Sequence, residues 1–149
     1  MDIHLGDISH IIQLSIAPVF LLTGVGTKLA VLTNRLARII DRSRVLEDRL
    51  GAAGGAGFAE AHSELLTLYR RAHLINRAIT LSTCCGLLVC VVIAALFIGD
   101  ALDLALAKFI ALCFVAGMLS LIGSFVYLLR EIFVATQTLS RRNLPSVPK

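Results

Sequence analysis

Charged residues are scarce in this 149-residue sequence. Asp, Glu, Lys and Arg together make up 16% of it, whereas a soluble domain carries about 25%. Hydrophobic residues make up 57%, and in water such an apolar excess would cause aggregation. The same composition excludes an intrinsically disordered chain, which has few apolar residues and a high net charge. The sequence therefore indicates an integral membrane protein.

The sequence also lacks the patterns of several other protein classes. The four Cys lie inside apolar segments and the eleven Gly show no period of three, which excludes a disulfide scaffold and a collagen-like chain. It contains no Cys-x-x-Cys pair and no His at the spacing of metal ligands. Catalysis needs a nucleophile, a base and their partners in one place, and no such set is evident. We expect no enzymatic activity, no cofactor and no metal.

Three segments are long and apolar enough to cross a hydrocarbon core of ~30 Å, which needs about 20 helical residues. They are residues 8–32, 78–98 and 104–129. Backbone polar groups in lipid must be satisfied within their own segment, so each span should be an α-helix. The sequence predicts an all-α fold, with residues 1–149 forming a single membrane domain that ends in a tail over residues 130–149.

Basic residues are unevenly distributed along the chain. Eight Arg lie within residues 33–77, and the tail adds three Arg and one Lys. Cytoplasmic segments of multi-pass proteins carry such an excess, so we expect the N-terminus outside and residues 33–77 and the C-terminus in the cytoplasm. The positive charge is then an orientation signal. No nucleic-acid recognition motif accompanies it, and we expect no nucleic-acid binding.

Apolar residues between the first two spans recur at alternating steps of three and four. The first series is Leu36, Ile39, Ser43, Leu46 and Leu50, and the second is Phe58, Ala61, Leu65, Leu68, Ala72, Ile75 and Ile79. A glycine-rich segment, residues 51–57, separates them. Two such series joined by a flexible turn predict a cytoplasmic antiparallel helical hairpin over residues 33–77, with coiled-coil packing. A helix lying on the inner leaflet is the alternative.

Small and polar residues of the first span fall on one side of a helix at 100° per residue, and basic residues seven apart continue that side. These candidate lining residues are Gln13, Gly24, Thr27, Lys28, Arg35, Arg42 and Arg49. In one interpretation the span packs this side against the protein's own helices, and the Arg residues are solvated. In the other, several copies line a pore whose basic cytoplasmic vestibule favours anions. Pro18 predicts a kink within the same span.

The third span has small residues on one face. Gly117, Ser120 and Ser124 lie three and four residues apart. Such spacing lets helix backbones approach closely in a membrane. We therefore expect these three residues to pack against another helix, either of the same chain or of another subunit.

Two short runs carry a resemblance to a known family. They are Ala17-Pro18-Val19-Phe20-Leu21-Leu22-Thr23-Gly24-Val25-Gly26, and Asn34-Arg35-Leu36 followed by Asp41-Arg42-Ser43-Arg44. With three spans and a hairpin, the chain from about Asp7 to Leu139 resembles a family of short bacterial inner-membrane proteins that is catalogued as a domain of unknown function. The resemblance implies this location and topology, and it supplies no catalytic residues.

The sequence thus predicts a homo-oligomeric structural or interaction protein of the bacterial inner membrane. Its surroundings are the lipid bilayer and other copies of the chain. An anionic lipid or a cytoplasmic protein is the expected partner of the Arg-rich hairpin. The alternative function is a homo-oligomeric ion channel lined by the first helix.

Overall fold

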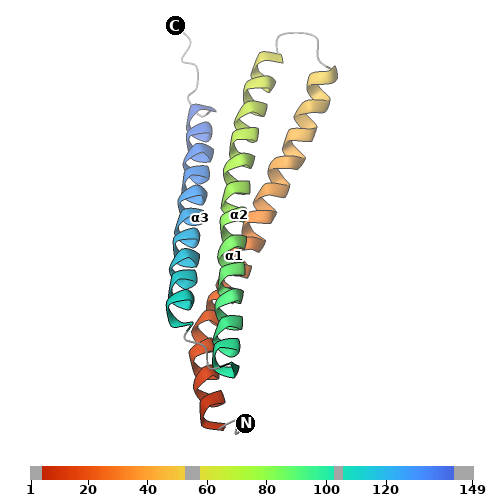
Figure 1. The fold of residues 1–149 in the computed structure, drawn as a ribbon. Helices are drawn as coiled ribbons and strands as arrows, with labels where there is room; N and C mark the ends of the chain where they lie inside the picture. Colours follow the sequence, from red (N-terminus) through yellow and green to blue (C-terminus); the bar gives the residue numbers. More distant parts are fainter. Residues whose placement is uncertain (1–4, 53–57, 103–105, 143–149) are drawn as a thin grey trace. The chain divides into compact units, whose positions relative to one another are not determined.

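The computed structural model describes residues 5–52, 58–102 and 106–142. They form α1 (Leu5–Ala52), α2 (Phe58–Ala101) and α3 (Ala107–Arg142), as Figure 1 shows. These described residues contain no strand. The predicted all-α fold is confirmed.

All three helices are long and apolar enough to cross a membrane. The 48 residues of α1 correspond to about 72 Å at 1.5 Å per residue, more than twice the ~30 Å of a hydrocarbon core. Only 17%, 28% and 17% of the most apolar windows of α1, α2 and α3 are buried inside the chain, so most of their apolar side chains face outward toward lipid. The chain is a multi-pass membrane protein. The ends of the three predicted spans stay predictions.

The chain divides into two compact units, and each takes a part of all three helices. Unit 1 combines Met1–Ala30 with Thr80–Gly123, and unit 2 combines Val31–Ile79 with Ser124–Lys149. Each unit has its own apolar core. In unit 1 the core is Val25, Cys85 and Val89, packed against side chains that include Leu22, Ile93 and Leu121.

The core of unit 2 is the seam between the two arms of the hairpin. Its buried residues are Leu32, Ile39 and Leu46 of α1 and Leu68, Ile75 and Ala78 of α2. On α1 they recur every seventh residue, as the heptad pattern requires. Tyr127 and Leu128 of α3 pack against the same cluster. Three helices therefore meet around the seam.

The ion pairs of unit 2 show that the two arms are antiparallel. Arg35 and Arg71 bind the same carboxylate, and Arg42 binds Glu64. Arg35 of α1 thus lies level with Arg71 of α2, and Arg42, seven residues later on α1, lies level with Glu64, seven residues earlier on α2. The two arms therefore run antiparallel. Gly51 and Ala52 of the predicted glycine-rich segment belong to α1, and residues 53–57 lie outside the described residues. Supercoiling of the arms stays a prediction.

Phe58, a member of the predicted apolar series, is not part of the seam cluster. The side chain of Phe58 is 51% exposed. Its ring stacks on His62, with the ring centroids 6.2 Å apart and the planes within 4° of parallel. Phe58 is the first residue of α2, where one helical neighbour can cover the ring.

Candidate functional site

Three of the four candidate lining residues of unit 1 lie on an uncovered side of α1. Gln13, Gly24 and Thr27 are exposed. A methyl group built on Gly24 would meet no atom within 4 Å, and the Thr27 hydroxyl donates to the Thr23 carbonyl within its own helix at 3.0 Å. Lys28 is half-buried. Packing against the chain's own α2 and α3 therefore does not account for this side of α1.

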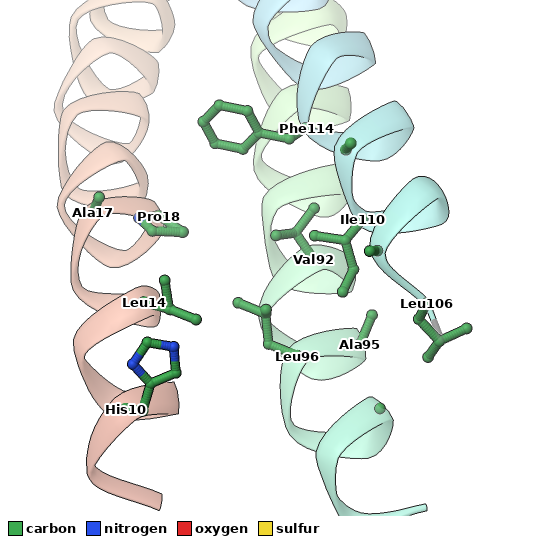
Figure 2. A pocket seen from close by; sticks show the side chains of 13 residues that line it. His10, Leu14, Ala17, Pro18, Val92, Ala95, Leu96, Leu106, Ile110 and Phe114 are labelled. Carbon is green, nitrogen blue, oxygen red and sulfur yellow. The ribbon is translucent and has the colours of Figure 1, made fainter. Parts of the chain in front are cut away.

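Pro18 lies inside α1, which continues on both sides of it. Its side chain is buried and lines a hollow of about 740 Å³ in unit 1. In Figure 2, His10, Leu14 and Pro18 of α1 lie opposite Val92 and Leu96 of α2, with Ile110 and Phe114 of α3 alongside. Apart from His10 the labelled side chains are apolar, so this hollow suits an apolar group such as an acyl chain. The predicted kink at Pro18 stays a prediction.

The small face of α3 contacts α2. Gly117 is buried, and a methyl group built on it would lie 3.6 Å from Leu88 Cβ and 3.8 Å from the Cys85 carbonyl oxygen. Ser120 donates a hydrogen bond to the Leu81 carbonyl at 2.8 Å in unit 1. In unit 2, Ser124 donates one to the Ala78 carbonyl at 2.6 Å. Side chains of this size allow the two backbones to approach closely.

A buried carboxylate joins the three helices of unit 2. The side chain of Glu131, on α3, is only 1% exposed. Its Oε2 accepts a hydrogen bond from Arg35 Nη1 of α1 at 2.6 Å. Its Oε1 accepts two from Arg71 of α2, at 3.0 Å from Nε and 2.8 Å from Nη2. A buried charge is tolerated when it is paired and hydrogen-bonded, and both oxygens of Glu131 meet this condition.

A second pair joins the arms further along the hairpin. Arg42 donates to Glu64 Oε1 from Nε at 3.2 Å and from Nη2 at 3.1 Å. The two side chains are 44% and 19% exposed, so solvent weakens this pair more than the Glu131 pairs. Of the candidate lining residues in unit 2, Arg35 and Arg42 are thus held by carboxylates. Arg49 is exposed, and no ion pair joins it to another described residue.

Arginine side chains surround a pocket of about 260 Å³ in unit 2. It is lined by Arg35, Arg38, Ile39, Arg42, Leu68 and Arg71. Arg35 and Arg71 are oriented by Glu131, and Arg42 by Glu64. Among the described residues no carboxylate pairs with Arg38, whose side chain is exposed. Guanidinium groups arranged in this way recognise carboxylate and phosphate oxygens.

The described residues hold no group of three His, Cys, Asp or Glu side chains that could bind a metal ion. The four Cys, at positions 84, 85, 90 and 113, are free thiols. The arginine pocket is therefore the most developed polar site in the part of the chain that the structure describes. Its groups bind and orient anions, and they provide no nucleophile.

Residues 15–141 match a family described as a protein of unknown function, DUF2721. The chain belongs to this family. No curated protein and no solved structure matches it. In this DUF2721 chain the matched region contains the four arginines of the pocket and Glu131, while Gln13 lies just before it.

Sequence reasoning did not identify Glu131 and Arg71 as site residues of the DUF2721 chain. One signal for Glu131 is present, since Gly117, Ser124 and Glu131 are seven residues apart and therefore share a helix face. A carboxylate on the packing face of a helix needs a partner. Its two partners are 96 and 60 residues away in sequence, and no local pattern identifies them.

Proposed function

We propose that the chain is a homo-oligomeric structural or interaction protein of the bacterial inner membrane. The observation that supports self-association is the uncovered side of α1 with Gln13, Gly24 and Thr27. Small and polar residues in membrane helices are typical of contacts between helices, and the chain's own α2 and α3 do not cover this side. A second copy of α1 is the partner that we infer.

Enlarging Gly24 should break up the oligomer. A Cβ at position 24 would meet no atom of its own chain within 4 Å, and the position is exposed, so the protomer should fold normally. Close approach of a second helix would be lost, and we expect the association constant to fall roughly tenfold or more, as for the loss of about 1–2 kcal/mol. The measurement is the mass of the purified protein in mild detergent, by size-exclusion chromatography with light scattering.

Gly26→Leu is the matched control for Gly24→Leu. Gly26 is also exposed with open space around it, but two residues along a helix turn the side chain by about 200°. This variant should keep the mass of the unmodified protein. Equal dissociation of both variants, or a monomeric unmodified protein, would contradict the proposed interface.

The Arg distribution supports an orientation with the N-terminus outside and the hairpin in the cytoplasm. On a background without the four native Cys, Gly51→Cys should react with a membrane-impermeant maleimide only after the inner membrane is broken. Gly51 is exposed and unobstructed. Leu102→Cys, at a 62% exposed position beyond the end of α2, should react in intact cells. The reverse pattern of labelling would overturn the orientation.

A channel is the second candidate function, and the same exposed side of α1 favours it. Copies of α1 around an axis would present Gln13 and Thr27 to a water-filled path. The pairs of Arg35 with Glu131 and of Arg42 with Glu64 reduce the positive charge available to a vestibule, which makes anion selectivity the weaker part of this proposal. Conductance of the purified oligomer in planar bilayers separates a channel from a scaffold.

We propose no enzymatic activity and no cofactor, because neither the sequence motifs nor the polar groups of the arginine pocket supply a catalytic set. Anionic lipid and a cytoplasmic protein stay the predicted partners of the hairpin.

A further inference from the structure

The arginine pocket of unit 2 carries an excess of positive charge. Four guanidinium groups line it, and the carboxylates that bind them are Glu131 and Glu64. Two positive charges are left over. Asp41 lies in an adjoining hollow that Arg35 and Arg38 also line, so at least one positive charge remains if Asp41 is included.

The paired arginines keep part of their binding capacity. A guanidinium has five N–H donors, and Arg35 uses Nη1 for Glu131 while Arg42 uses Nε and Nη2 for Glu64. The side chains of Arg35 and Arg42 are 42% and 44% exposed. The carboxylates therefore orient these groups without enclosing them. Ile39 and Leu68 form the apolar part of the wall, along which a glycerol backbone or the start of an acyl chain can lie.

The pocket also lies at a suitable depth for a lipid headgroup. Measured from residue 32, the predicted end of the first span, Arg35 is about 5 Å and Arg38 about 9 Å further along α1 at 1.5 Å per residue. Each headgroup layer of a bilayer is about 5–8 Å thick. Arg71 precedes the predicted start of the second span by seven residues, which is about 10 Å. Arg35 thus lies within the headgroup layer, and Arg38 and Arg71 lie a few ångströms beyond it, where their long side chains can reach a headgroup phosphate.

We propose that this pocket binds the phosphate of an anionic phospholipid headgroup. Arg38 approaches the phosphate as the guanidinium without a carboxylate partner, and Arg35, Arg42 and Arg71 surround it with oriented donors. The remaining positive charge favours a headgroup with net negative charge over a zwitterionic one. Self-association is not needed for this site, because all its lining residues belong to one chain.

Lipid titration followed by native mass spectrometry tests the proposal on the full-length protein in detergent. Phosphatidylglycerol should bind more tightly than phosphatidylcholine with the same acyl chains, by about tenfold. Arg38→Gln should weaken phosphatidylglycerol binding by about tenfold, as expected for one lost charge-assisted hydrogen bond. Arg44→Gln removes the same charge from an exposed position of α1 outside the pocket, and it should change the affinity less than twofold.

Three results would overturn the proposal. Equal weakening by Arg38→Gln and Arg44→Gln would show that overall charge attracts the lipid, and no weakening by Arg38→Gln would exclude the pocket. Glycerol phosphate is the second arm of the titration, because a soluble phosphate ester has the same chemistry. If it binds in the absence of lipid as tightly as phosphatidylglycerol does, the source of the phosphate is not a lipid. The circular dichroism spectrum of Arg38→Gln should match that of the unmodified protein, since Arg38 makes no ion pair with any described residue.

Discussion

Glu131→Ala is expected to lower the free energy of unfolding by about 3 kcal/mol. Removing one partner of a buried ion pair typically costs about 3–5 kcal/mol, because the remaining charge stays buried and unpaired. The side chains of Arg35 and Arg71 are 42% and 26% exposed, so water can partly solvate them after the change. This favours the lower end of the range. Reversible unfolding in mixed detergent micelles measures the difference.

Glu64→Ala is the comparison for Glu131→Ala. It also removes a carboxylate that binds an arginine across the hairpin, but Glu64 is 19% exposed whereas Glu131 is 1% exposed. Such pairs contribute about 0–1 kcal/mol. If both variants lose the same stability, burial of Glu131 does not govern the strength of its pairs. Combining Glu131→Ala with Arg71→Ala should cost less than the sum of the single changes, because the two groups interact directly.

Leu46→Asp is expected to open the hairpin. Leu46 is 3% exposed within the core of unit 2. The change removes a buried leucine side chain, which alone costs about 2–5 kcal/mol when it becomes Ala, and it places a carboxylate in the apolar seam. Trypsin cleavage after Arg49 in the purified protein should become at least roughly tenfold faster, as for a local loss of more than 1.4 kcal/mol.

Val45→Asp is the control for the seam. Val45 is 45% exposed, so its replacement adds the same charge outside the core. Positions 45 and 46 both lie within one helical turn of Arg42 and Arg49. The introduced Asp can therefore form ion pairs with these arginines to a similar extent in the two variants. Equal cleavage of both would mean that the seam runs along a different face of α1.

The hairpin was predictable because its signal is local. Apolar residues at heptad spacing on both arms identify the sides that meet, and Leu32, Ile39 and Leu46 are buried as that spacing requires. The same periodicity fails at Phe58, since the first residue of a helix has fewer neighbours to cover it. The spacing of Gly117, Ser120 and Ser124 likewise located a packing face, but it did not specify that α2 covers it.

The arginine pocket could not be predicted in the same way. The seven-residue spacing of Arg35 and Arg42 on one side of the first helix is visible in the sequence. The carboxylates that bind these two arginines, however, lie on α2 and α3. Their identity depends on how far α2 and α3 are shifted along α1, which side-chain packing determines. For the first span, periodicity identified a polar side but not what covers it. The structure leaves Gln13 and Thr27 exposed, which local periodicity alone does not specify.

The pairing of Glu131 has a consequence for the order of synthesis. A ribosome adds about 5–20 residues per second, and Glu131 follows Arg71 by 60 residues. For roughly 3–12 s, therefore, the nascent hairpin contains Arg35 and Arg71 without the carboxylate that both bind. Like charges at that point oppose closure of the arms. The last helix to be made thus supplies the carboxylate that neutralises the repulsion between these two arginines of the first two helices.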